Sequence, residues 1–240
     1  MGCAAEASLQ DWLGRAIRCA APGARYDAVV AMVKTSAPRA SRQADPELAD
    51  NGPFGPFAPR LELPPGQDFW VFGYGSLIWH PGFPHVEVRP AHLYGYHRHF
   101  CVYSHVYRGT PDRPGLVLGL DHGGSCRGLA YRVPAAEGRE AMDYLYEREM
   151  VTAVYRPRWV APHSPQGPVT AAAFIVDRTH RQYAGRLPEP EVAEYIAAGC
   201  GDNGPNIDYL ENTVHHLEAM GLPDRSLAHL LRLVRARCPG

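Results

Sequence analysis

Residues 71–83 have the sequence VFGYGSLIWHPGF, and this stretch decides how the chain is organised. The apolar run DFWVFGY ends inside it. A strand there would place Gly73, Gly75 and Ser76 at its exit, where the absence of bulky side chains lets a ligand approach the backbone amides. No lysine follows as in a Walker loop, and the prolines that come next prevent the helix of a Rossmann fingerprint. The stretch therefore predicts either a tight turn plugged by aromatic side chains or a loop that binds a ligand other than a nucleotide.

The sequence downstream of Asp68 predicts an α+β fold. Short segments rich in Val, Tyr, Phe and Leu alternate with Gly/Pro turns, which indicates the strands of a curved sheet or barrel. Apolar residues at helical spacing predict four helices. The expected strands are 68–74, 86–106, 115–122, 126–133, 154–162 and 169–177. The expected helices are Glu137–Arg148, Glu189–Gly199, Ile207–Met220 and Ser226–Arg237.

The upstream part of the chain has a different composition. Residues 6–19 carry apolar side chains at helical spacing, which predicts a short amphipathic helix. Residues 36–67 are rich in Pro, Gly and Ala and are typical of a linker or an irregular arm. We therefore expect an N-terminal helical and irregular extension over residues 1–67 and one folded domain over residues 68–240.

Composition limits the classes of partner. The chain has 240 residues, 45% of them hydrophobic, and a formal net charge of −1, so nothing in its overall charge attracts nucleic acid or an anionic membrane. The six cysteines form no C-x-x-C pair and no zinc-type cluster with histidine. No signal peptide and no run of eighteen apolar residues is visible. These features predict a cytoplasmic protein without nucleic-acid or membrane partners.

The predicted helix that precedes residue 150 ends in charged residues. Glu147, Arg148 and Glu149 lie where the helix gives way to a strand. Spacing from Met142 and Leu145 places Glu149 on the apolar face and Glu147 on the outer face. A buried carboxyl group has a raised pKa and is suited to accept and donate protons near neutral pH. The alternative, which spacing alone favours, is that all three charges form a solvated helix end.

Several blocks of the sequence together resemble the ChaC-like γ-glutamylcyclotransferase family. These blocks are VFGYGSLIWHPGF, RGTPDRPGLVLGL, GLAYRV, YEREMVTAVYRPRWV and NIDYLENTVHHLEAMGLPD. They occur in the family's order between Asp68 and the C-terminus, and such an ordered series is far more specific than any single block. The N-terminal extension is not covered by the resemblance.

The resemblance implies a fold, a reaction and a set of site residues. The fold is a small mixed β-barrel with flanking helices, and the reaction converts the γ-glutamyl group of glutathione into 5-oxoproline with release of cysteinylglycine. Glu149 matches the family's catalytic acid/base. The residues matched to substrate binding are Phe72, Gly73, Tyr74, Gly75, Ser76, Leu77, Tyr155 and Tyr209. The implied partner is a small molecule, glutathione or a related γ-glutamyl peptide, with no cofactor and no metal, and we expect a monomer or weak dimer.

The reaction agrees with what the sequence lacks. The substrate's own α-amine attacks its γ-carbonyl, so no enzyme nucleophile is required, and no G-x-S-x-G elbow is present. A nucleophilic Ser76 activated by His80 is the weaker alternative, and His97 and His99, two residues apart on one strand, favour packing or surface roles over a metal site.

Two questions of specificity stay open at this stage. The first is whether the substrate is glutathione or other γ-glutamyl amino acids and amines, or whether the protein only senses such a ligand. The second concerns Ala153 and Val154, because family members often carry glycine shortly before the tyrosine that Tyr155 matches. That departure puts the local turn in question.

Overall fold

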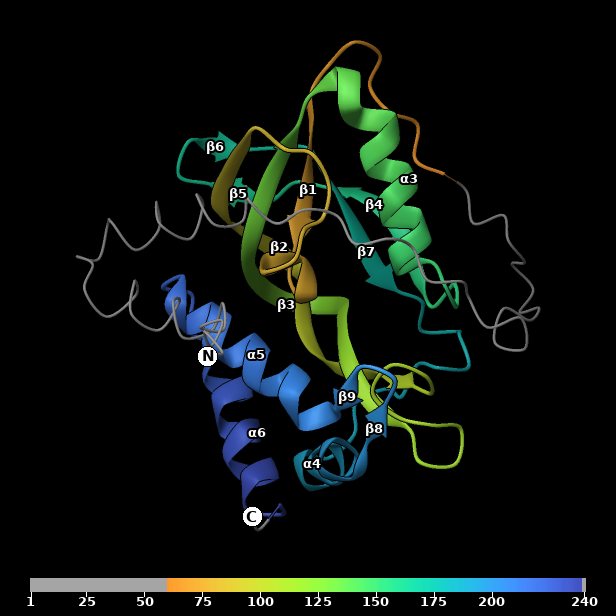
Figure 1. The fold of residues 1–240 in the computed structure, drawn as a ribbon. Helices are drawn as coiled ribbons and strands as arrows, with labels where there is room; N and C mark the ends of the chain where they lie inside the picture. The colour runs from red at the N-terminus through yellow and green to blue at the C-terminus, as the bar shows by residue number, and fades with distance from the viewer. Residues whose placement is uncertain (1–59, 239–240) are drawn as a thin grey trace, which may run out of the picture.

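The computed structural model describes residues 60–238, which form a curled mixed sheet with helices on its side and at one end (Figure 1). The seven strands of this sheet are β1 (Phe69–Gly73), β2 (Glu87–Ser104), β3 (Gly115–Val133), β4 (Tyr155–Val160), β5 (His163–Ser164), β6 (Gly167–Pro168) and β7 (Ala171–Val176). The predicted helix over residues 6–19 and most of the predicted arm lie outside the described residues.

Strand β1 is central in the sheet, whose order is β4-β7-β1-β3-β2-β5-β6. It pairs antiparallel with β3 and parallel with β7, and β3 also pairs with β7 at Leu120 and Ile175. This second contact curls the sheet into a half-barrel whose edges are β4 and β6, so the predicted α+β class and barrel-like curvature are confirmed. All five residues of β1 are buried.

The long β2–β3 hairpin corrects one expectation. Residues 115–122 and 126–133, predicted as two strands, form the single strand β3. Gly123 and Gly124 lie inside it with φ of 100° and 67°, and Gly95 lies opposite them in β2 with φ of 81°. Glycine adopts such backbone angles at little cost, so the three residues bend the hairpin at a bulge without ending either strand.

Four α-helices complete the described domain. They are α3 (Gly138–Glu149), α4 (Glu189–Ala198), α5 (Asn206–Ala219) and α6 (Arg225–Arg235). Each begins and ends within two residues of its predicted bounds. Helix α3 lies along the side of the sheet, whereas α4, α5 and α6 contact one another at one end of β3 (Figure 1). The described helices include none that is long and apolar enough to cross a bilayer.

Short elements connect these parts. The 3-10 turns η1 (Ser76–Ile78) and η2 (Ala135–Glu137) follow β1 and β3, and a two-stranded hairpin joins β8 (Cys200–Gly201) to β9 (Gly204–Pro205) before α5. The turn η1 lies between the end of β1 and helix α5 (Figure 1).

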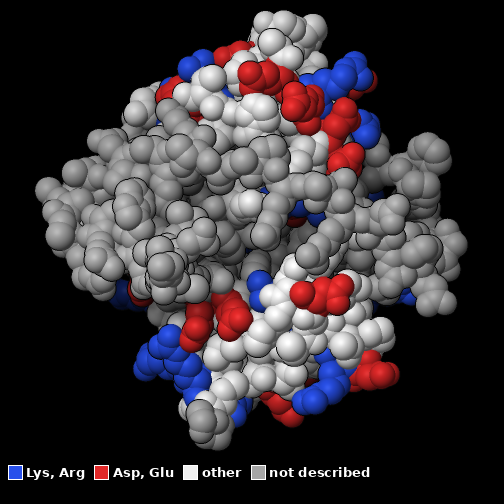
Figure 2. Space-filling view, in the orientation of Figure 1, with Lys and Arg blue, Asp and Glu red and all other residues white. Residues whose placement is uncertain are grey.

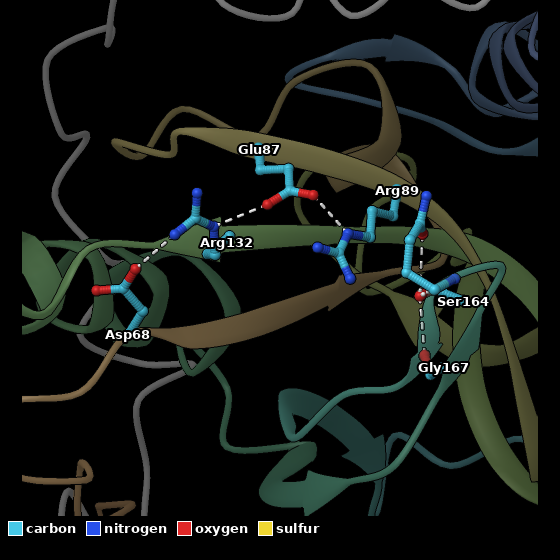
Figure 3. Close-up of polar contacts among 7 residues, drawn as sticks. Asp68, Glu87, Arg89, Arg132, Ser164 and Gly167 are labelled. Carbon is cyan, nitrogen blue, oxygen red and sulfur yellow. Dashed lines mark hydrogen bonds and ion pairs between the residues drawn. The ribbon is translucent and has the colours of Figure 1, made fainter.

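Ion pairs between charged side chains connect the ends of neighbouring strands in the sheet. The guanidinium of Arg132, in β3, donates to Asp68 at 2.8 Å and to Glu87 at 2.9 Å, and Glu87 also accepts from Arg89 (Figure 3). Elsewhere on the described surface in Figure 2, groups of both signs are interspersed, in keeping with a net charge near zero.

Candidate active site

A cleft of about 1330 Å³ opens where β1, α3 and α5 meet. Seven of the predicted site residues line it: Tyr74, Gly75, Ser76, Leu77, Glu149, Tyr155 and Tyr209. The other two, Phe72 and Gly73, are buried strand residues beneath the loop and do not line the cleft. Segments some 75 residues apart in the chain therefore converge on one cavity.

The loop that leaves β1 is fixed by hydrogen bonds on its inner side. The amides of Ile78 and His80 donate to the carbonyls of Gly75 and Ser76 at 2.9 Å each. From below, the buried hydroxyl of Tyr131 donates toward two carbonyls of η1, Leu77 at 2.8 Å and Ile78 at 3.0 Å. The turn is therefore held by the sheet and does not depend on a ligand for its shape.

Two glycines of this loop lie close to tyrosine hydroxyls, and at one of them, Gly82, no other residue fits without a shift of its neighbour. A Cβ atom at Gly75 would stand 3.4 Å from the Tyr209 hydroxyl oxygen, so a side chain there would enter the cleft. Gly82 has a φ of 72°, and a Cβ atom there would overlap the hydroxyl of Tyr144 on α3 at 2.0 Å. A side chain is therefore excluded at Gly82, whereas Gly75 leaves room for a methyl group, and the approach of a ligand to the backbone at Gly73, Gly75 and Ser76 stays a prediction.

Glu149 is the last residue of α3, and only 17% of its side chain is exposed. Burial raises the pKa of its carboxyl group, and the neighbouring guanidinium of Arg148, 3.1 Å away, partly offsets that rise. Glu147 is exposed, as the helical spacing predicts. The carboxyl group therefore faces the cleft in a setting that favours proton exchange closer to neutral pH than an ordinary glutamate.

Three tyrosines surround this carboxyl group. Burial raises the pKa of Tyr74, Tyr155 and Tyr209, and the negative charge of Glu149 raises each of them further. The Tyr155 hydroxyl donates to the carbonyl of Leu118 at 2.9 Å. All three phenols are consequently neutral at physiological pH and line the cleft as hydrogen-bonding groups.

Arg148 is the site residue that sequence reasoning missed. Its Nη2 donates to the Ser76 hydroxyl at 2.8 Å, and its Nη1 donates to the His80 carbonyl and, at 3.1 Å, to the Tyr144 hydroxyl. Helical spacing assigned faces to the two glutamates and left the residue between them undecided. The signal that was available is its position beside a carboxylate on the buried face, where a cation offsets the cost of burial.

The geometry at Ser76 does not favour the nucleophile alternative. The contact that the structure gives this hydroxyl is the Arg148 guanidinium, which is always protonated and cannot act as a base. The loop serine is thus held as an acceptor on the wall of the cleft.

The histidine pair of β2 lies away from this cleft. The rings of His97 and His99 stack with centroids 4.7 Å apart, and His99 Nε2 lies 3.2 Å from the buried Asp121 carboxylate. Within residues 60–238, no three His, Cys, Asp or Glu side chains are grouped so that they could hold a metal ion.

The turn between α3 and β4 contains the departure noted at Ala153. This residue has a φ of 55°, the only positive φ of a non-glycine residue in the described chain. The left-handed region costs alanine roughly 1–2 kcal/mol. A glycine would adopt the same backbone angles without that cost, so alanine bears the strain at this turn.

Comparison with known proteins agrees with this geometry. A family profile described as ChaC-like protein matches residues 69–237. This chain belongs to the ChaC-like family. The glutathione-specific γ-glutamylcyclotransferase of Escherichia coli is 37% identical over 167 residues, which cover 69% of this chain and 72% of that protein. The human glutathione-specific γ-glutamylcyclotransferase 1 is 34% identical over 71% of this chain and 78% of its own length.

A solved structure shares the fold. The crystal structure of a γ-glutamylcyclotransferase specific to glutathione from yeast aligns with a TM-score of 0.64 over 71% of this chain and 99% of its own, at 24% sequence identity. The ChaC-like domain is thus a half-barrel with a cleft at the exit of its central strand.

Proposed function

We propose that this protein is a γ-glutamylcyclotransferase that converts glutathione into 5-oxoproline and cysteinylglycine. The observation that carries the proposal is the buried carboxyl group of Glu149 in the same cleft as the loop that leaves β1. The relatives named above, glutathione-specific γ-glutamylcyclotransferases from a bacterium and a mammal, support the choice of substrate.

The chemical step is an intramolecular acyl transfer. The α-amine nitrogen of the γ-glutamyl group attacks the γ-carbonyl carbon, and a new C–N bond closes the five-membered lactam. The bond from that carbon to the cysteine nitrogen then breaks, and the leaving nitrogen takes up a proton. Holding the γ-glutamyl chain curled in the cleft supplies most of the advantage, because well-oriented intramolecular reactions reach effective molarities of about 10⁵ M or more.

Glu149 is suited to manage the protons of this step. A free α-amine has a pKa of about 7.7–8.0, so at neutral pH most substrate molecules carry an ammonium group that cannot attack. The Glu149 carboxylate takes one proton from this ammonium group so that the free amine attacks, and that nitrogen loses a second proton as the lactam forms. Glu149 passes both protons in turn to the cysteine nitrogen, which leaves as the ammonium group of cysteinylglycine. The raised pKa of Glu149 makes the return of each proton easier than it would be from an exposed glutamate.

The loop after β1 is suited to hold negative charge. Its turn bonds use the amides of Ile78, Trp79 and His80. Gly75, Ser76 and Leu77 line the cleft, and within the described chain no backbone acceptor pairs with their amides, which makes these amides the candidate donors to the substrate. These amides bind either the α-carboxylate of the substrate or the oxygen that gains charge as the lactam closes. One such donor is typically worth about 3 kcal/mol in the transition state.

Product analysis of the wild-type protein tests the proposal. Purified protein incubated with glutathione is expected to release 5-oxoproline and cysteinylglycine in equal amounts, faster than it releases 5-oxoproline from γ-glutamylalanine. Preference for γ-glutamylalanine would move the assignment to a cyclotransferase of other γ-glutamyl compounds. Binding of glutathione without any 5-oxoproline would instead identify a sensor.

We also propose that the protein works in the cytoplasm as a monomer or weak dimer. The described cysteines are all free, and two of them, Cys200 and Cys238, are exposed, which suits a reducing compartment. Light scattering of the purified chain measures the oligomeric state.

A further inference from the structure

A second arginine lines the cleft at a distance from Glu149. Arg108 lies on the loop between β2 and β3, and its Nη1 donates to two carbonyls of the β8–β9 hairpin region, Asn203 at 2.7 Å and Pro205 at 2.9 Å. Backbone bonds tie the same loop and hairpin together, since the amides of Asp202 and Asn203 donate to Val106 and Tyr107. The guanidinium is thus held in a fixed place.

Arg108 makes no ion pair among the described residues. Burial lowers the pKa of its guanidinium, and the more distant carboxylate of Asp208 partly offsets that change. Of the two arginines that line the cleft, Arg148 is paired with Glu149, whereas no carboxylate of the described residues lies within 4.0 Å of Arg108. Both hydrogens of its Nη1 are directed to the hairpin, and within the described chain no acceptor is assigned to Nε and Nη2. These two nitrogens form the side-on edge with which arginine binds a carboxylate in bidentate fashion.

Tyr209 connects this guanidinium to the loop after β1. The Cζ atom of Arg108 lies 5.7 Å from the centroid of the Tyr209 ring, and the hydroxyl of the same ring lies 3.4 Å from a Cβ position at Gly75. An extended dipeptide spans about 7 Å. A peptide with its γ-glutamyl group at Gly75 therefore has the length to pass along Tyr209 and reach Arg108.

Given the proposed function, we infer that Arg108 binds the carboxylate of the terminal glycine of glutathione. The cleft then recognises both ends of the tripeptide, the γ-glutamyl group at the loop after β1 and the glycine carboxylate at the β2–β3 loop. Arg108 sets specificity and takes no part in proton transfer. Substrates that lack a carboxylate at this position lose the charge-assisted hydrogen bonds and bind less tightly.

A two-by-two kinetic comparison tests this inference. The substrates are glutathione and its glycyl monoethyl ester, in which an uncharged ethyl ester replaces the terminal carboxylate, and the proteins are the wild type and Arg108→Gln. For the wild type, kcat/KM is expected to fall about 10- to 100-fold on the ester, mainly through KM. Arg108→Gln is expected to lose a similar factor on glutathione and almost nothing further on the ester. Arg108→Lys keeps the positive charge but loses the bidentate geometry of the guanidinium, so its kcat/KM on glutathione is expected to lie between those of the wild type and Arg108→Gln.

The matched control is Arg113→Gln, an exposed arginine on the same loop, which is expected to keep the wild-type preference for glutathione over the ester. Equal rates of the wild type on both substrates would overturn the inference and leave the proposed function intact, even if Arg108→Gln failed to fold. An equal loss by Arg108→Gln on both substrates would show that the arginine only holds the loop. Absence of 5-oxoproline from wild type and glutathione would overturn the proposed function and this inference with it.

Discussion

The Glu149 carboxyl group lies between two opposing influences, burial that raises its pKa and the Arg148 guanidinium that lowers it. Because burial is the larger, the carboxylate that accepts the substrate proton forms only above the ordinary pKa of 4.5. We therefore expect kcat to fall as the pH falls through this raised pKa. A kcat profile between about pH 3 and 9 measures the position of this acid limb, and a limb at or below pH 4.5 would contradict the raised pKa.

Replacement of Arg148 is expected to shift the acid limb of the kcat profile, where kcat falls at low pH. Arg148→Gln removes the charge that favours the carboxylate, so the acid limb is expected at higher pH than in the wild type, with a lower plateau because Ser76 and His80 lose their donor. Arg148→Lys keeps the charge and is expected to keep the limb close to its wild-type position. If the acid limb of the kcat profile stayed at its wild-type pH in both variants, Arg148 would act only on the conformation of the loop after β1.

The exposure of individual residues could be predicted from the sequence where helical periodicity determines it. Helical spacing predicted a more buried Glu149 and an exposed Glu147, and the exposure of the two side chains in the structure agrees. Spacing is silent about contacts between distant segments. The bonds of Arg148 to Ser76, 72 residues away, and of Arg108 to the β8–β9 hairpin therefore needed the fold.

At the scale of elements, the turn η1 depends on one hydroxyl beneath it. Tyr131→Phe removes the donor to the Leu77 and Ile78 carbonyls and leaves those buried oxygens without it. We expect the free energy of unfolding to fall by about 1–3 kcal/mol and turnover to fall as the turn loosens. Tyr94→Phe, on an exposed ring, is the control for chemical denaturation and kinetics. Full turnover in Tyr131→Phe would show that the turn is held by other contacts.

A substitution in the strained turn between α3 and β4 is expected to raise the stability of the protein, whereas Tyr131→Phe lowers it. Ala153→Gly relieves a positive φ at a cost in unfolded-chain entropy, so a net stabilisation of up to about 1 kcal/mol is expected, or roughly 2–4 °C in Tm. Ala228→Gly, inside α6, is the matched control and is expected to lower Tm by a similar amount. A lower Tm in Ala153→Gly would mean that the alanine methyl group contributes packing that outweighs the strain.

Element boundaries followed from the sequence where local chemistry sets them. The four helices of the domain begin and end close to their predicted bounds, and α5 ends just before the predicted stop at Gly221. Strand β3 was divided in error because Gly123 and Gly124 resemble a turn, whereas cross-strand pairing to β2 carries the chain through them. Pairing of this kind is a tertiary effect that local propensity does not contain.

At the scale of the whole molecule, the contacts of residues 60–67 indicate at which residue a stably folded domain begins. The amide of Leu61 donates to the Tyr146 hydroxyl at 2.7 Å, and Leu61 and Leu63 pack against the core. A chain that begins at Arg60 is expected to fold and to keep its turnover, whereas one that begins at Asp68 is expected to lose about 2–4 kcal/mol of unfolding free energy. Urea denaturation measures both.

The full-length double variant Leu61→Ala/Leu63→Ala is the control for this truncation, since it removes the packing and keeps the chain. Equal stability of the chains that begin at residues 60 and 68 would contradict a role for these leucines. Sequence composition alone placed this boundary in a Pro/Gly-rich region, because two leucines among prolines give no periodic signal.

The most direct test of the account compares Glu149→Gln with Glu140→Gln, which changes an exposed glutamate of the same helix that does not line the cleft. Both are assayed for 5-oxoproline release from glutathione, and calorimetry on the same preparations measures glutathione binding. Glu149→Gln is expected to lose about 10²–10⁴-fold in kcat with binding retained, whereas Glu140→Gln keeps wild-type turnover. Turnover by Glu149→Gln within a few-fold of the wild type would contradict the assignment of proton transfer to this carboxyl group.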